Sequence, residues 1–110
     1  MSKLIKDRNE LAKTCRSPEG VFVLFYATWC PFSQRFLPVY EKAAETKGKA
    51  FVRFAVDDDE DACQAHGVEV YPTVLYFKDG KIVHRLDGGF HVGLDEKQLA
   101  GLVKTCSAAE

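Results

Sequence analysis

The chain has 110 residues, of which 46% are hydrophobic and 28% are charged, and its formal net charge at pH 7 is -1. These values fit one globular domain with a real core, and we expect a single domain over residues 1–110. The small net charge gives no reason to expect nucleic acid or an anionic membrane as a partner. No stretch approaches the roughly 18 to 20 apolar residues of a membrane span, and the start of the chain is too polar for a signal peptide. We therefore expect a cytoplasmic monomer.

Four cysteines, Cys15, Cys30, Cys63 and Cys106, are widely and irregularly spaced, and no Cys-X-X-Cys pair occurs. This spacing is unlike a disulfide framework and unlike a structural zinc site, and it suits a reducing compartment. The fragment from Cys63 to His66 offers only two ligands, so an ordinary helical turn is the better interpretation. We expect no metal and no bound cofactor.

Patterns in the first half of the chain predict, in order, a short strand at 3–5, a helix at about 6–15, a strand at 21–26 and a helix at about 31–47. Leu11 and Cys15 lie one helical turn apart, which makes Cys15 a core residue. The run at 21–26 is apolar throughout and β-prone, as expected of a central strand buried on both faces. The last helix is predicted by apolar residues that recur every four positions, with a kink at Pro38. These residues are Phe32, Phe36, Tyr40 and Ala44.

The second half predicts, in order, a strand at 51–56, a short helix after the acidic run 57–61, strands at 73–77 and 82–86, and a helix at about 94–106. The acidic run is interpreted as carboxylates near a helix N-terminus, rather than as a metal site. An Asp-Gly turn within 78–81 joins the last two strands as an antiparallel hairpin. Helical spacing turns Cys106 toward the core. The element order indicates an α/β fold whose mixed sheet of four or five strands has parallel central strands, an antiparallel hairpin at one edge, and flanking helices.

Cys30 stands between the apolar strand and the helix that begins at Pro31. At a helix N-terminus, unpaired backbone N–H groups and the positive end of the dipole favour a thiolate, the form in which cysteine attacks. Pro31 suits the first helical position because its missing N–H costs nothing there. Ser33 can direct its hydroxyl or its N–H at the same sulfur, or can be an ordinary first-turn residue. We predict that Cys30 is a nucleophile assisted by Ser33, in preference to an inert buried cysteine.

Ser33 occupies the position where a disulfide oxidoreductase carries its second cysteine. A serine cannot form a disulfide, so a client bound to Cys30 must wait for an outside thiol or for another of its own cysteines. Net two-electron transfer by this site alone is therefore excluded. The site can still perform three kinds of reaction: reversible capture, isomerisation of client disulfides, and exchange assisted by glutathione or another small thiol.

Five motifs in order resemble the thioredoxin family over nearly the whole chain, and together they are specific. They are the active-site approach Phe25–Cys30, the helix proline Pro38, the strand end Val56–Asp57, the cis-proline loop Val70–Thr73, and the hairpin Phe77–Gly80 with Gly88. The resemblance implies a thioredoxin fold with a cis-proline loop. It also implies thiol–disulfide exchange on protein or peptide partners, a role in cell redox homeostasis, and a reductase or glutathione as a further partner.

By this resemblance Pro72 is cis and lies against Cys30, and the backbone of Tyr71 binds an extended client peptide. A trans proline at the start of an edge strand is the alternative for Pro72. Trp29 is expected to line the surface beside the thiol. Phe32 either presents an apolar face to the client or belongs to the core. The implied client-binding residues are Trp29, Pro31, Phe32, Tyr71 and Pro72.

The chain departs from the family pattern at two positions, and both departures remove parts of the dithiol mechanism. Ser33 replaces the resolving cysteine, and Leu24 replaces a buried acidic residue that is thought to assist that cysteine. Losing both suggests that the dithiol step was abandoned in this lineage, although an engineered Cys→Ser change remains an alternative. Arg53 takes the place of a lysine near that carboxylate, with no evident role. The stretch after Cys30 also resembles monothiol members of the protein disulfide isomerase group.

Three hypotheses remain open. The first is an enzyme that exchanges disulfides or isomerises them through Cys30 alone. The second is a client-binding module that uses the groove around Trp29, Tyr71 and Pro72, with covalent capture or without it. The third gives Cys30 a distant resolving partner, for which Cys63 is the candidate because it is not clearly on a core face.

Overall fold

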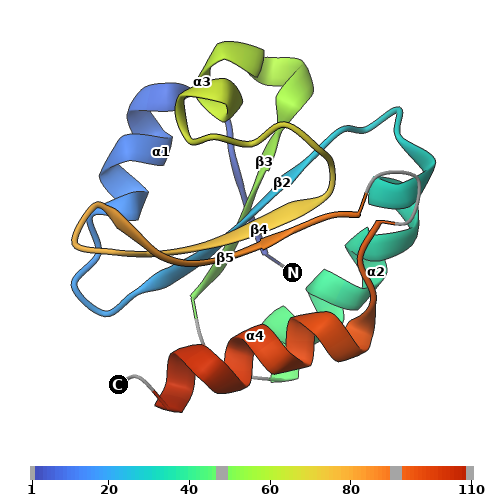
Figure 1. Cartoon of the computed structure of the whole chain (residues 1–110). Helices are drawn as coiled ribbons and strands as arrows, with labels where there is room; N and C mark the ends of the chain where they lie inside the picture. The colour runs from blue at the N-terminus through green and yellow to red at the C-terminus, as the bar shows by residue number, and fades with distance from the viewer. Residues whose placement is uncertain (1, 47–49, 90–92, 109–110) are drawn as a thin grey trace.

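The computed structural model describes residues 2–46, 50–89 and 93–108, and it contains a five-stranded sheet with helices on both faces (Figure 1). The strand order is β1-β3-β2-β4-β5. In chain order the elements are β1 (Lys3–Ile5), α1 (Arg8–Cys15), β2 (Val21–Tyr26), α2 (Pro31–Thr46), β3 (Phe51–Ala55), the 3-10 turn η1 (Val56–Asp58), α3 (Glu60–Ala65), β4 (Thr73–Lys78), β5 (Lys81–Asp87) and α4 (Glu96–Ala108).

β2 is the central strand, as its apolar run predicts. All six of its residues are buried. It pairs in parallel with β3, which pairs in parallel with β1, and it pairs antiparallel with β4 on its other side. β4 and β5 form the predicted antiparallel hairpin at one edge. The mixed sheet and its flanking helices therefore confirm the α/β fold expected from the element order.

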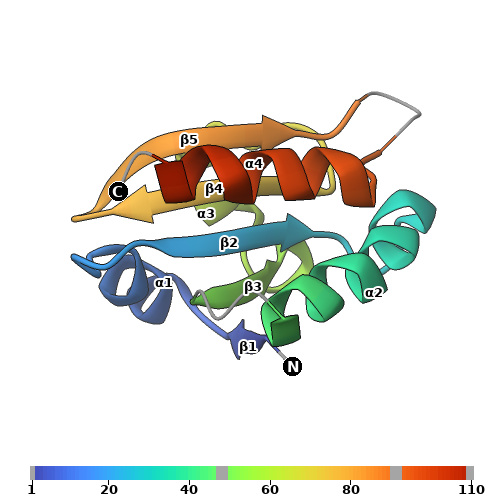
Figure 2. The same cartoon turned by 90° about the horizontal axis from the view of Figure 1, so that it is seen from below.

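α1 and α3 cover one face of the sheet and α2 and α4 cover the other, and Figure 2 views the sheet from the side of α2 and α4. One core contains residues of α1 and α3, such as Leu11 and Cys63, packed against the odd-numbered residues of β2. The other contains residues of α2 and α4, such as Tyr40 and Leu99, packed against its even-numbered residues. A strand alternates its side chains between faces, so β2 contributes to both cores, as do β3 and β4. The start of α2 follows the C-terminal end of β2, and this places Cys30 at the edge of the first core.

Element boundaries differ from the sequence predictions by small steps with local causes. α1 begins at Arg8 because Asp7 caps it, its carboxylate accepting a hydrogen bond of 2.8 Å from the Glu10 N–H. α4 begins at Glu96 because Asp95 and Gln98 form a reciprocal capping pair with backbone-to-side-chain distances of 2.8 and 3.0 Å.

α2 contains Pro38 and runs through it without a break. Tyr40, on the same helix, is fully buried, and its hydroxyl lies 2.6 Å from the Val52 carbonyl oxygen and 3.0 Å from that of Phe22. α2 is therefore fixed to two neighbouring strands by a polar contact as well as by apolar packing. No helix within the described ranges is long and apolar enough to cross a membrane.

Candidate active site

Cys30 begins α2 and faces the loop that contains Tyr71. Its N–H donates to the Ala27 carbonyl at 3.1 Å, and its carbonyl accepts the first helical hydrogen bond from Gln34 at 2.9 Å. This is the position of an N-cap, where the following N–H groups of the helix have no partner within the helix. Its thiol lies 3.9 Å from the Tyr71 carbonyl oxygen, to which it can donate. At 9% exposure it is the most accessible of the four cysteines.

Ser33 is buried, with 1% of its surface exposed, and its side chain is directed at the strand-to-helix connection. Its hydroxyl oxygen accepts a hydrogen bond of 3.2 Å from the Ala27 N–H. The sequence analysis directed either this hydroxyl or the Ser33 N–H at the Cys30 sulfur, and among the described residues the hydroxyl is bonded to the backbone instead. Ser33 therefore shapes the turn that presents Cys30, instead of being an ordinary first-turn residue on the surface.

The segment before Cys30 is held by two side chains to which sequence reasoning gave no such role. The Asp57 carboxylate accepts from the Thr28 N–H at 3.1 Å and from its hydroxyl at 2.7 Å. The side-chain amide of Gln34 donates to the Thr28 carbonyl at 2.8 Å. The two hydrogen bonds from Thr28 to Asp57, that of the hydroxyl first, lower the pKa of the Asp57 carboxyl below its usual value. The sequence offered one signal for the Thr28–Asp57 contact. Parallel pairing of β2 and β3 brings the C-terminal ends of both strands, which these residues follow, to the same edge of the sheet.

The loop before β4 supplies the other wall of the site. The Tyr71–Pro72 peptide bond is cis, and Pro72 is buried. Gly88 lies so close to this loop that a Cβ atom there would be 2.3 Å from the Pro72 carbonyl oxygen. Only a residue without a side chain fits this approach. The Tyr71 backbone therefore stands beside Cys30, as the resemblance implies.

The aromatic residues beside the thiol differ in exposure. Trp29 is 67% exposed, so it lines the surface as expected. Phe32 is half-buried against the first core, with the Arg35 guanidinium 5.7 Å from the centre of its ring. A Cβ atom added to Gly93 would be 3.0 Å from the Phe32 Cβ. Phe32 thus belongs partly to the core and partly to the rim, and Pro31 is exposed.

The structure decides the position of Cys63, which the sequence did not place clearly on a core face. Cys63 is fully buried on α3, and burial raises the pKa of its thiol to about 11. The Tyr71 hydroxyl and this thiol interact, which places the tyrosine ring between the cis-proline loop and α3. Cys15 and Cys106 face the core as predicted, and burial raises the pKa of Cys15 to about 12. A thiol that rarely ionises is a poor resolving partner.

Leu24 and Arg53 lie opposite one another on β2 and β3. Leu24 is fully buried among apolar side chains of the second core. The guanidinium of Arg53 contacts the Ser2 carbonyl and lies 3.7 Å from the carboxylate of Glu41, on α2. Glu41 also accepts from the Ser2 N–H at 2.7 Å. Arg53 therefore has a structural carboxylate partner, although the residue opposite it is apolar.

Neither His66 nor His84, the two histidines that the structure describes, contacts Cys30. His66 caps the end of α3, and its ring packs between Phe25 and Phe77 at centroid distances of 5.9 and 5.3 Å. His84 lies on β5, and His91 lies outside the described residues. Within the part of the chain that the structure describes, no group of three or more His, Cys, Asp or Glu side chains could hold a metal ion.

Fold and site together define a thioredoxin-like protein with a cysteine at the start of a helix, opposite a cis-proline loop. The profile of the family described as Thioredoxin matches residues 4–104. Thioredoxin-1 of Caenorhabditis elegans is 37% identical over 84 residues, covering 74% of this chain and 73% of that protein. Thioredoxin-1 of Saccharomyces cerevisiae is 36% identical over 84 residues, covering 76% and 82%. The chain belongs to the thioredoxin family.

Solved structures agree with this assignment. The thioredoxin of Malassezia sympodialis superposes with a TM-score of 0.84 at 25% identity, covering 96% of this chain and 90% of that one. The chain also matches protein disulfide-isomerase A5 of Mus musculus at 30% identity over 80 residues, which is 16% of that longer protein. Family membership and these relatives support a thiol–disulfide redox function.

Proposed function

We propose that this protein exchanges thiols and disulfides through Cys30 alone, forming mixed disulfides with protein or small-molecule partners and serving cell redox homeostasis. The observation that carries the proposal is the pairing of Cys30, the most exposed of the four cysteines at 9% and 3.9 Å from the Tyr71 carbonyl, with a buried serine at the position of the second cysteine. The four free cysteines fit a reducing compartment such as the cytoplasm.

In the first step the Cys30 thiolate attacks one sulfur of a client disulfide. A bond forms between the two sulfurs, the client disulfide breaks, and the other client sulfur leaves as a thiolate that takes up a proton. The unpaired N–H groups at the start of α2 stabilise the attacking thiolate. The backbone of Tyr71 is positioned to pair with an extended client chain beside the new bond.

In the second step a thiol from outside the site attacks the mixed disulfide and restores Cys30. Glutathione, another small thiol, or a second cysteine of the client can supply that sulfur, and the new disulfide leaves with it. Ser33 cannot take this role because it lacks a sulfur, and its oxygen is bonded to the Ala27 amide. Cys63 is unsuited because its thiol is fully buried. The exchange therefore turns over only when such a thiol is supplied.

A second candidate is a client-binding module without turnover. The exposure of the Trp29 ring, 67% beside the site, favours it, since large aromatic side chains in water commonly mark binding surfaces. In that case clients bind the groove of Trp29, Tyr71 and Pro72, and the cysteine is dispensable for binding. Cys30→Ala distinguishes the two candidates, because it abolishes disulfide exchange by the first but leaves client binding by the second intact.

The test is capture of a peptide whose single cysteine carries a thionitrobenzoate leaving group. We expect stoichiometric release of the chromophore and an adduct that peptide mapping places on Cys30. Cys30→Ala should abolish the adduct, while Cys15→Ala, which alters a buried cysteine of α1, should leave it unchanged. Addition of glutathione should then regenerate the free protein.

Two results separate the candidates. Peptide binding of equal affinity in Cys30→Ala, with no adduct in the wild type, would establish the module instead of the exchanger. An adduct on a cysteine other than Cys30 would refute both the nucleophile and the order of steps.

A further inference from the structure

A hollow of about 340 Å³ opens beside Tyr71, on the side of the site that faces α3. Its lining comes from α3 and from the segment that leads into the cis-proline loop. The residues are Glu60, Gln64, Val68, Glu69 and Tyr71. Tyr71 belongs to both places, because its carbonyl oxygen lies 3.9 Å from the Cys30 sulfur while its side chain lines the hollow. A client held at Cys30 therefore has this hollow directly next to it.

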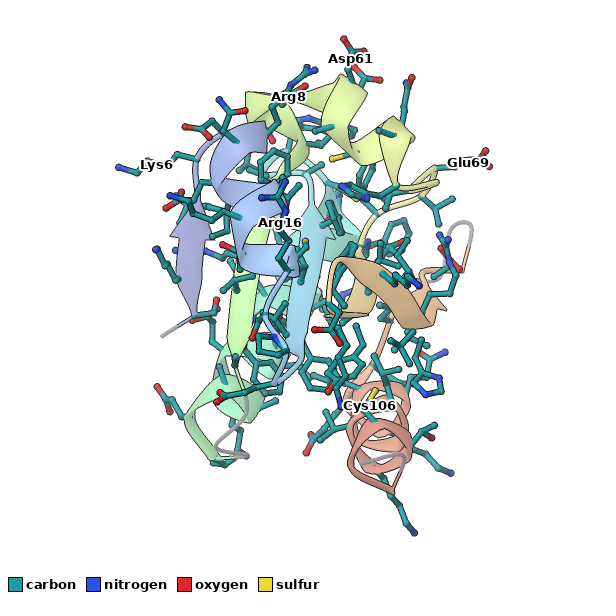
Figure 3. The ribbon with its side chains drawn as sticks, turned by 90° about the vertical axis from the view of Figure 1, so that its left-hand side faces the viewer. Lys6, Arg8, Arg16, Asp61, Glu69 and Cys106 are labelled. Atoms are coloured by element: carbon teal, nitrogen blue, oxygen red, sulfur yellow. The ribbon has the colours of Figure 1, made fainter. Side chains whose placement is uncertain are left out.

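The two glutamates of the hollow differ from the acidic residues around them. Asp57 is bonded to Thr28, Asp59 to Arg8, and Asp87 to Arg85. Glu60 and Glu69 are exposed, and neither carboxylate has a hydrogen bond or an ion pair with another described residue. Figure 3 shows Glu69 pointing away from the sheet.

Arg85 does not neutralise these two carboxylates. Arg85 senses the charge of Glu69, but its guanidinium is bonded at 2.9 and 2.7 Å to Asp87 and at 3.0 Å to the Gly67 carbonyl. The negative charge of Glu60 acts on the Tyr71 hydroxyl, where it helps burial to raise the pKa to about 12. The negative charge in the hollow therefore acts on Tyr71, the residue whose carbonyl oxygen lies next to the Cys30 sulfur.

The lining has the chemistry of a site for a long cationic side chain. The half-buried Tyr71 gives the hollow an aromatic wall. The methylene stem of Lys or Arg packs against such surfaces while its charged end remains solvated. The carboxylates of Glu60 and Glu69 and the amide oxygen of Gln64 supply acceptors for that charged end.

We propose that this hollow selects clients with a lysine or arginine close in sequence to the reactive cysteine, whose side chain enters between Glu60 and Glu69. The inference rests on the proposed capture of clients by Cys30 and adds the substrate class. It makes α3 a specificity element of the site. Acidic clients are disfavoured by the same two carboxylates.

The experiment measures capture rates for matched short peptides that carry a central cysteine activated with thionitrobenzoate. Lys, Gln or Glu is placed in turn at each flanking position. In each reaction the Cys30 thiolate attacks the peptide sulfur, the peptide–thionitrobenzoate bond breaks, and thionitrobenzoate leaves with the electron pair. The leaving group is the same throughout, so the ratio of rates reports the flanking residue alone.

We expect at least one position where the Lys peptide is captured about tenfold faster than the Glu peptide at low salt, a difference of about 1.4 kcal/mol, because the two carboxylates attract the Lys side chain and repel the Glu side chain. The ratio should fall as salt is raised. Glu60→Gln combined with Glu69→Gln should bring it close to one. Glu19→Gln, at an exposed glutamate in the turn before β2, is the matched control and should leave the ratio unchanged.

Equal capture of Lys and Glu peptides at every position, with the adduct on Cys30, would overturn this inference and leave the proposed function standing. A charge preference that persists in the double variant would also overturn it. If no peptide is captured, the proposed function falls and the inference falls with it.

Discussion

Replacing Ser33 by cysteine tests whether the missing sulfur alone confines the chemistry to capture. The introduced thiol would occupy a site with 1% exposure, where the serine oxygen now lies 3.2 Å from the Ala27 N–H. Buried thiols of this protein ionise poorly, since burial raises the pKa of Cys63 to about 11. Leu24 is fully buried and apolar, so it offers no base that could take the proton. We expect Ser33→Cys to release a captured client, but slowly near neutral pH.

The magnitude follows from the thiolate fraction. A thiol that ionises like Cys63 is about 10⁻⁴ thiolate at pH 7, against about 3% for an ordinary cysteine, a ratio of roughly 300. The greater nucleophilicity of the more basic thiolate recovers about tenfold of this, so release should be roughly 30-fold slower than an ordinary thiol would give. Each unit of pH above 7 should accelerate it about tenfold until the introduced thiol begins to titrate.

The assay loads Cys30 with a fluorescent peptide as a mixed disulfide, removes free thiols, and follows release over a range of pH. The wild type should hold the peptide at every pH, and Ser33→Ala should behave in the same way. Ser33→Cys should release it with the steep pH dependence described above. Release from the wild type would show that another cysteine resolves the adduct. A flat pH profile for Ser33→Cys would refute the link between burial and slow resolution.

Three further predictions concern the frame around the site. Leu24→Ala should destabilise the protein by about 2 to 5 kcal/mol in urea titrations, because the side chain is fully buried. The capture rate of the folded fraction should not change. Tyr40→Phe should lower the free energy of unfolding by about 1 kcal/mol and the melting temperature by roughly 4 to 8 °C, through loss of the hydroxyl contacts with two strands. Burial lowers the pKa of His66, so the stability that its neutral ring provides is present above roughly pH 6.5 and is lost as the pH falls toward the lower folded value. The slope should stay below about 1.4 kcal/mol per pH unit, since the ring is only half-buried, and His66→Gln should remove it.

The frame could be predicted from the sequence because each main element carries a strong local pattern. The run at 21–26 is apolar on both faces, which identified the central strand, and the four-residue period beginning at Phe32 identified α2. Cys30 was found because its neighbours mark a strand-to-helix junction. Such patterns need only residues close in sequence.

Features that depend on distant pairs were missed or misread. Cys63 lies on a helix of six residues, too short for periodicity to reveal its buried face. The Thr28–Asp57 contact joins residues 29 positions apart, and Arg53 pairs with a glutamate on a different element. The partner of the Ser33 hydroxyl stayed open between the sulfur and other groups, because spacing alone does not reveal the competing Ala27 amide.

Trp29 is the only tryptophan of the chain, and it stands in water immediately before the reacting cysteine. Indole emission depends on how much solvent surrounds the ring, so the intrinsic fluorescence of this protein is a signal from the client surface rather than from the core. A client that lies across the ring would shield it and change that emission before any bond to sulfur forms. Docking and covalent capture could then be timed separately, without attaching a label to the protein.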